Sequence, residues 1–348
     1  IMNAATEFDL GPLTWVKGEI DLALQRAEGA LGLFEASADS TQLKFCRTHV
    51  HQVHGALAIV GLDGVALLTE STEALLAGME EDRLPAGDAA LAVLRQTLNA
   101  LHQYLDDLMA GEPNQPLRLL PAVQALAKAR GLAIPHPCEL FYPDLSLRPS
   151  KRAVEAPMLS SEQLLHALKS ERMHFQKGLL SWLRKPAEAE IGRQVMCEAV
   201  AGIEKVQPTP SARSFWWISL ALLESLADPK LAADPVARQL CSRIDAQIRR
   251  LLEGSSNVAE RVLREALYYI AQAPAGLHPL VDEVQSVFRL AKLLPSTAAA
   301  TAAQPHQAAL RKLRETLTAV EELWNKFCTG NGGSLAGFAD NARNCAQL

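Results

Sequence analysis

Apolar residues recur at intervals of three and four along most of this chain, and that helical spacing is the feature that most constrains its fold. The clearest stripe consists of Leu43, Cys46, Val50, Val53, Leu57 and Val60. Leucine, alanine and valine supply most of the 49% hydrophobic content, whereas aromatic residues, which favour strands, make up only 5%. No segment alternates apolar and polar residues between hairpin turns. The sequence therefore predicts an all-α fold made of up-down four-helix bundles in tandem.

Charge and cysteine usage exclude several classes of protein. The net charge of −5 and the lack of a basic stripe argue against nucleic-acid binding. The six cysteines are scattered without a CxxC pair, which favours reduced thiols. The N-terminal segment lacks the basic and apolar regions of a signal peptide, and the longest apolar run, Phe215 to Leu223, ends at Glu224. We expect a cytoplasmic protein without membrane insertion.

The N-terminal part, residues 8–130, is predicted to form the first bundle. Helices are expected at 13–34, from a cap at Ser40 or Thr41 to about Leu62, and at 64–78, 88–110 and 117–130. A proline-rich segment, 131–159, then reads as a linker. Its apolar residues Leu140 and Phe141 predict that it docks partly on a bundle.

The rest of the chain is predicted to hold a second bundle and the beginning of a third unit. The second bundle is expected over residues 160–294, with helices at 161–185, 188–206, 213–227, 234–253, 257–273 and 279–293. A low-complexity linker, 295–305, follows. Residues 306–348 open a third helical unit that we expect to be truncated, because two helices cannot bury a core alone.

The helix that carries the long apolar stripe also carries the candidate site. His51 and Gly55 fall on its outward face, His54 lies at the flank, and Arg47 lies one turn before His51. An exposed imidazole can attack the aspartyl phosphate of a partner, and a nearby positive charge steadies the phosphoryl oxygens. The missing side chain at Gly55 lets the partner approach, and Ile59 offers it apolar surface. This pattern indicates phosphoryl transfer through histidine.

The segment HQVHG at 51–55, followed by Gly61, resembles the HxxKG…G motif of histidine phosphotransfer (HPt) domains. The longer segments LTWVKGEIDLAL, FCRTHVHQVHGALAIVGLDGVALL and LFYPDLSLRP resemble the N-terminal region of the CheA-like hybrid histidine kinase of type IV pilus (twitching motility) systems. FQKGLLSWLR, SFWWISLALLESLA and VLREALYYIAQA resemble the next segment of that protein. The resemblance therefore covers nearly the whole chain in order.

The resemblance implies HPt-like bundles in series within a chemotaxis-like two-component pathway, with response regulator receiver domains as partners. The parent protein would be a histidine kinase, although this chain has no catalytic core of its own and its status as an enzyme stays open. A kinase-less pilus regulator related to this region is a second identity that fits. The expected function is to accept or relay phosphate. The alternative is a non-phosphorylated scaffold that binds a response regulator or a polar-localisation protein, and such a partner would bring the chain to the cell pole.

The sequence departs from the HPt motif at His54, where these domains usually carry lysine. A histidine is only about one-quarter protonated at about pH 7, whereas a lysine is charged, so phosphoryl stabilisation should be weaker. Three interpretations of His51 remain: a phosphoacceptor, a vestigial site on a bundle that now only binds partners, and a metal ligand with Cys46, His49 and His54. The last is disfavoured because His49 and His51 point about 200° apart on a helix. We predict no metal or cofactor.

A second match to the motif, His174-Phe175-Gln176-Lys177-Gly178, keeps the lysine. It falls on the first helix of its unit, whereas the HPt histidine lies on the second. His174 and Lys177 are therefore the less favoured phosphoacceptor site. Trp216 and Trp217 occupy the position of the histidine helix in this second bundle, which we predict to be degenerate, and we expect both rings in the core.

Overall fold

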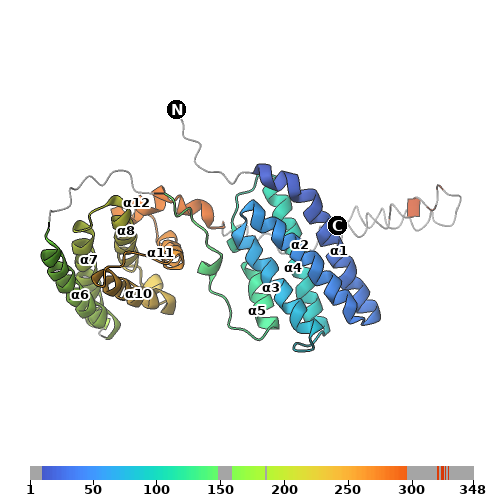
Figure 1. Ribbon diagram of the computed structural model, residues 1–348, viewed down its shortest axis with the longest axis horizontal. Helices are drawn as coiled ribbons and strands as arrows, with labels where there is room; N and C mark the ends of the chain where they lie inside the picture. Colours follow the sequence, from blue (N-terminus) through green and yellow to red (C-terminus); the bar gives the residue numbers. More distant parts are fainter. Residues whose placement is uncertain are drawn as a thin grey trace. The chain divides into compact units, whose positions relative to one another are not determined.

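The computed structural model describes residues 10–147, 159–184 and 186–295, and the separate positions 320, 323, 324, 326 and 328. Over these residues it contains α-helices and short 3-10 helices and no β-strand, which confirms the all-α prediction. The described residues up to Leu294 belong to one compact unit with two hydrophobic cores. The first core is formed mainly by α1 to α5 and the second by α6 to α12 (Figure 1).

The first group of helices forms a four-helix bundle with one added helix. Its members are α1 (Leu10–Ser37), α2 (Ser40–Val60), α3 (Asp63–Glu80), α4 (Asp88–Met109) and α5 (Leu120–Ala129). α1 packs against α2 and α4, and α3 packs against α2 and α4, so the four helices close around one core. Because the α1–α2 and α2–α3 connections are short, each helix runs antiparallel to the next. α5 packs on α3 and α4 after a 3-10 turn at Pro116–Leu119.

The ends of α2 are fixed by local backbone chemistry. Asp39, and not Ser40 or Thr41 as expected, is the N-cap, and its side chain accepts a hydrogen bond from the Thr41 backbone N–H at 2.9 Å. At the other end Gly61 adopts a left-handed conformation with φ of 80°, which a glycine does without steric cost. The chain then turns at once into α3.

The proline-rich segment packs against both cores. It forms a 3-10 helix at Pro137–Leu140. Leu140 belongs to the first core, and Phe141, the next residue, belongs to the second. The Arg264 guanidinium lies over the Tyr142 ring, 4.7 Å from its centroid. Residues 148–158 of the predicted linker lie outside the described part of the chain.

The second group is larger than a four-helix bundle. Its helices are α6 (Ser161–Arg184), α7 (Ala189–Lys205), α8 (Pro210–Ser225), α9 (Pro229–Ala232), α10 (Pro235–Leu252), α11 (Glu260–Gln272) and α12 (Pro279–Val287), with 3-10 helices at Pro186–Glu188 and Leu290–Leu293. α8 lies between α7, α11 and α12. Trp216 and Trp217 of α8 are 3% and 0% exposed, which confirms that both rings are core residues. The short helix α9 was not expected.

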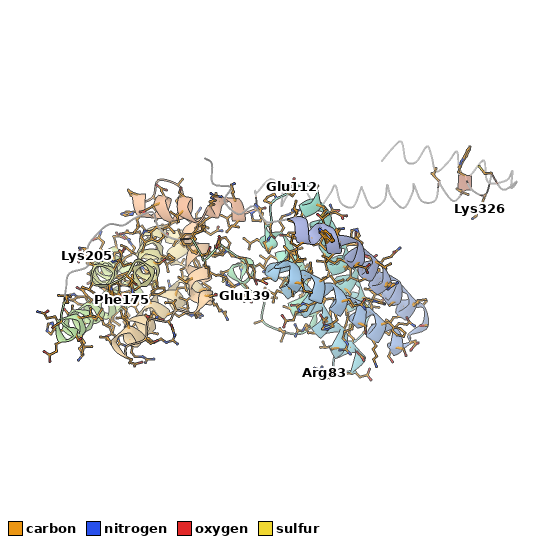
Figure 2. The ribbon with its side chains drawn as sticks, turned by 45° about the horizontal axis from the view of Figure 1, so that its top comes forward. Arg83, Glu112, Glu139, Phe175, Lys205 and Lys326 are labelled. Carbon is orange, nitrogen blue, oxygen red and sulfur yellow. The ribbon has the colours of Figure 1, made fainter. Side chains whose placement is uncertain are left out.

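Two glycines allow α6 and α7 to pack closely. A Cβ on Gly178 would lie 2.7 Å from the Gly192 carbonyl oxygen, and a Cβ on Gly192 would lie 2.6 Å from the Trp182 backbone nitrogen. Phe175, one turn before Gly178, is fully buried inside the second group (Figure 2). The two backbones therefore approach to a distance that any larger residue would prevent.

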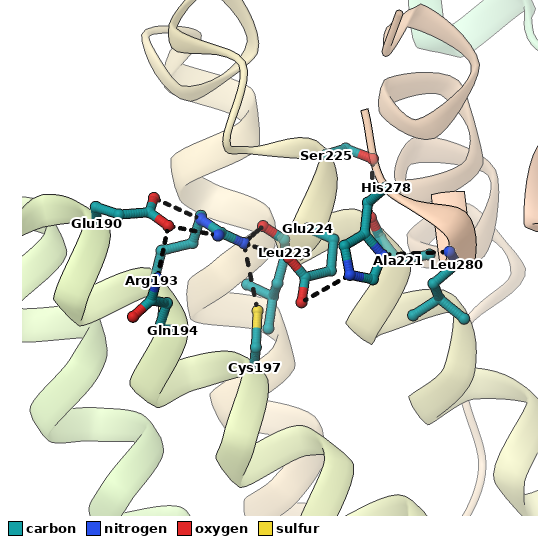
Figure 3. A network of polar contacts seen from close by, with 10 residues as sticks. All are labelled: Glu190, Arg193, Gln194, Cys197, Ala221, Leu223, Glu224, Ser225, His278 and Leu280. Atoms are coloured by element: carbon teal, nitrogen blue, oxygen red, sulfur yellow. Dashed lines mark hydrogen bonds and ion pairs between the residues drawn. The ribbon is translucent and has the colours of Figure 1, made fainter. Parts of the chain in front are cut away.

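An ion-pair network centred on the buried Arg193 joins α7 to α8 (Figure 3). Arg193 is 6% exposed and donates to the Glu190 carboxylate at 2.6 and 2.9 Å, to Glu224 Oε2 at 2.6 Å and to the Leu223 carbonyl at 3.1 Å. The hydrogen bonds from Arg193 to the Glu190 carboxylate hold the pKa of Glu190 below its ordinary value. His278, the N-cap of α12, lies with Nε2 4.0 Å from Glu224 Oε1. The network satisfies a guanidinium that would otherwise be costly to bury.

The predicted linker at 295–305 and the predicted third unit at 306–348 lie almost entirely outside the described residues. None of the helices in the described part is long and apolar enough to span a bilayer.

Candidate phosphotransfer site

His51 projects from the middle of α2 into solvent. Its side chain is 72% exposed, while Val50, Val53 and Leu57 are 0–1% exposed, as the apolar stripe predicted. The imidazole Nδ1 lies 3.0 Å from Oε2 of Glu73 on α3. A carboxylate can only accept a hydrogen bond, so Nδ1 carries the proton in this contact. The lone pair of the neutral ring is then on Nε2, the other ring nitrogen.

Glu73 is a site residue that the sequence motif did not reveal. It lies 22 positions from His51 and its side chain is 21% exposed. The antiparallel hairpin of α2 and α3 places it there, because the two residues lie at similar distances from the turn at Gly61 and Leu62. That register, counted outward from the turn, is the signal from which Glu73 could have been found.

His54 lies on the side of α2 that faces α3, as its flank position on the helix predicted. Its Nδ1 is 3.0 Å from Thr69 Oγ1 and 3.2 Å from the Ala66 carbonyl oxygen. The rings of His51 and His54 are nearly parallel, with an interplanar angle of 20° and centroids 6.3 Å apart. The two imidazoles therefore form one stack along the α2–α3 seam.

Arg47, the cation expected to assist His51, is already paired. Its Nε donates to Glu80 Oε2 at 2.9 Å, and both side chains are partly exposed. An ion pair of this kind contributes little to stability, but it directs the guanidinium toward the far end of α3. The positive charge near His51 is therefore smaller than the sequence alone suggested.

The surface that follows His51 along α2 is open. Apart from the adjoining backbone of α2 and the two neighbouring residues, no described atom lies within 4 Å of the position that a Cβ on Gly55 would occupy. Ile59, one turn further, is 86% exposed. An apolar side chain this exposed next to an unobstructed backbone is suited to contact with a partner.

The second motif has different surroundings. The His174 side chain is 61% exposed, and its Nδ1 lies 3.6 Å from Glu171 Oε2, one turn earlier on the same helix. This distance is too long for a hydrogen bond. Lys177 is exposed, but Gly178 is buried against α7, so the glycine serves helix packing and leaves no room for a partner.

The metal interpretation of the first motif finds no support in the geometry, because Cys46 is buried in the core while His51 points to solvent. Elsewhere in the described residues, Asp21, His102 and Asp106 lie close enough to share an ion. The Lys17 ammonium occupies that position, with contacts of 2.6 Å to Asp21 and 2.8 Å to Asp106. A lysine therefore already offsets part of the negative charge of this acidic cluster.

Two parts of the chain match known domain families, one over each helical group. Residues 13–104 match the Hpt domain, and residues 160–301 match the FimL scaffold protein second domain. The chain is also 28% identical over 329 residues to the scaffold protein FimL of Pseudomonas aeruginosa (strain PAO1), an alignment that covers 89% of this chain and 57% of that protein. The chain is homologous to FimL. No solved structure matches it.

The homology to FimL changes what can be said of each bundle. The chain spans little more than half of this relative, which is named a scaffold. The Hpt match supports the expected phosphotransfer-type module in the first bundle. The second bundle matches a FimL domain, so its origin as a degenerate HPt bundle stays a prediction. Membership in the CheA-like kinase family also stays a prediction.

Proposed function

We propose that the first bundle is a histidine phosphotransfer module of a type IV pilus signalling pathway and that His51 is its phosphoacceptor. The observation that carries this proposal is the 3.0 Å contact between His51 Nδ1 and the Glu73 carboxylate, made by a His51 side chain that is otherwise 72% exposed. The carboxylate orients the ring and selects the tautomer in which Nε2 is the nucleophile. The nucleophilic nitrogen is thus presented to solvent, where a partner can reach it.

The reaction needs only groups that this site and a receiver domain supply. Nε2 of His51 attacks the phosphorus of an aspartyl phosphate on the receiver, the N–P bond forms, and the aspartate leaves as a carboxylate as the P–O bond breaks. The proton stays on Nδ1, and the negative charge of Glu73 stabilises the positive charge that develops on the ring. The reverse reaction returns the phosphoryl group to a receiver.

The open surface at Gly55 and Ile59 is the docking area in this proposal. The receiver backbone would approach over Gly55, where no side chain obstructs it, and an apolar receiver residue would rest on Ile59. The second bundle would bind partners without transferring phosphate, because its α8 carries buried tryptophans in place of an exposed histidine.

The test uses phosphoramidate, a small phosphoryl donor, and a receiver domain charged with acetyl phosphate. His51→Gln should abolish phosphate uptake from both donors, and Glu73→Gln should slow it by at least about tenfold, because the amide cannot compensate charge on the ring. His49→Gln is the matched control on the same helix, since the His49 imidazole Nδ1 lies 3.2 Å from the neutral Gln52 amide oxygen and not beside a carboxylate of the described residues. Uptake that survives His51→Gln and disappears in His174→Gln would move the assignment to the second bundle.

A scaffold without phosphotransfer is the second candidate, and the name of the homologous protein favours it. In this case the bundle binds a receiver or a polar-localisation protein, and His51 is a surface residue. Wild-type protein would then take no phosphate from either donor, while receiver binding measured by calorimetry would be unchanged in His51→Gln and weakened in Ile59→Asp.

A further inference from the structure

The tautomer of His54 follows from the hydrogen bonds around Thr69. The Thr69 hydroxyl donates its one hydrogen to the Ala66 carbonyl oxygen at 2.7 Å, so its oxygen can act only as an acceptor toward a third group. His54 Nδ1 lies within hydrogen-bond distance of both oxygens, and neither has a hydrogen to give. Nδ1 must therefore be the donor. In the neutral ring the unprotonated nitrogen is Nε2.

Both imidazoles are held in the same way. His51 and His54 each bind α3 through Nδ1, and their rings lie nearly parallel, 6.3 Å apart. Each Nε2 is on the opposite edge of its ring, directed away from its α3 partner. Because the ring centroids are 6.3 Å apart, a phosphoryl group on Nε2 of His51 would lie near the His54 ring, whose neutral form carries a lone pair on Nε2.

We infer that phosphoryl transfer at His51 is coupled to proton uptake by Nε2 of His54. This inference rests on the proposed function. The lone pair of the neutral ring repels the phosphoryl oxygens, whereas the protonated ring keeps its Nδ1–H bond to Thr69 and carries a positive charge and a second N–H, on Nε2, close to the phosphoryl group. The proton comes from solvent, and it returns to solvent when the phosphoryl group leaves. His54 is thus a proton-dependent positioning residue for the phosphoryl group.

The charges around His54 favour this coupling. α3 carries no lysine or arginine, and its charged residues are Asp63, Glu70, Glu73 and Glu80. On α2 the nearest permanent cation, Arg47, is held by Glu80. The buried residues of α1 are apolar, its Lys17 is held by Asp21 and Asp106, and its Glu28 carries a negative charge near Cys46 of α2. Lys44, the other cation of α2, lies two turns before His51 and nearly three turns before His54. A phosphoryl dianion on His51 would therefore draw a proton to His54, which is closer.

The experiment compares initial rates of phosphorylation by phosphoramidate in wild type and His54→Lys between about pH 6 and about pH 9. Lysine stays charged over this range, and the pH dependence of His51 and of the donor is common to both proteins. The ratio of the wild-type rate to the His54→Lys rate therefore isolates His54. We expect the ratio to fall with rising pH and to approach a loss of about tenfold per pH unit, the limit for uptake of one proton.

A measurement on wild-type protein avoids any effect of the substitution on folding. Nitrogen chemical shifts of the imidazoles should identify the neutral His54 ring as the Nδ1–H tautomer. Phosphorylation of His51 should increase the fraction of His54 rings that are protonated at a given pH. A rate ratio that is constant with pH, an Nε2–H tautomer, or wild-type protein that is inert at low pH while His54→Lys is active would overturn the inference. If neither protein takes up phosphate at any pH, the proposed function itself is wrong.

Discussion

Replacing Gly178 by alanine tests whether the close approach of α6 and α7 holds the second bundle together. The new Cβ would lie 2.7 Å from the Gly192 carbonyl oxygen and 3.0 Å from the Met196 backbone nitrogen. These are backbone atoms, which cannot yield unless the helices separate. Overpacking costs about 1–3 kcal/mol, and the better helix propensity of alanine returns about 1 kcal/mol. Taking the upper half of that range, we predict a net loss of about 1–2 kcal/mol.

The assay is urea unfolding followed by tryptophan fluorescence. Trp182, Trp216 and Trp217 lie in the second bundle, whereas Trp15 is 89% exposed and changes little on unfolding. Gly202→Ala on α7 is the matched control, because the three atoms nearest to its Cβ all belong to the flexible Glu171 side chain. We expect this control to be neutral or slightly stabilising. A Gly178→Ala protein that unfolds at the same urea concentration as wild type, or at a higher one, would refute the packing argument.

Three further outcomes follow from the described contacts. Gly55→Ala should stabilise the first bundle by about 0.5–1 kcal/mol in urea melts followed by circular dichroism, because its Cβ meets nothing. Arg193 lowers the folded-state pKa of Glu190, so the stability that this pair contributes is present above the ordinary carboxyl pKa and is lost as the pH falls through the lowered value. Glu190→Gln should therefore make acid unfolding of the second bundle less steep. Burial raises the pKa of the Cys46 and Cys241 thiols to about 12, so a thiol reagent should modify them only after urea is added.

The sequence predicted what depends on local periodicity. The buried face of α2 was correct at Val50, Val53 and Leu57, since a helix repeats its orientation every few residues regardless of its neighbours. Val60 is only partly buried because α2 ends there and Gly61 turns the chain away. The cap was misassigned to Ser40 or Thr41, because neighbouring polar residues compete for a single position that only the backbone angles decide.

Contacts between helices were harder to predict. The Glu73 contact depends on the register of α3 against α2, and the pairing of Arg47 with Glu80 depends on the same register. Neither contact can be predicted from the spacing of residues along a single helix. Burial of Trp216 was predictable from its apolar neighbours, but the charged network under Arg193 was not. The network around Arg193 joins side chains from two helices, and no short sequence motif predicts such a contact.

The two histidine motifs of this chain show why spacing alone does not select a phosphotransfer site. By motif, His174 is the better match because it keeps the lysine three residues on, whereas His51 has His54 there. By surroundings the order is reversed, because His174 lies 3.6 Å from a carboxylate of its own helix and is followed by a glycine buried against α7. A side chain one turn away on the same helix cannot fix a ring as firmly as one anchored on a neighbouring helix. Tertiary support and open space, not the residue at the fourth position of the motif, are the features that favour His51.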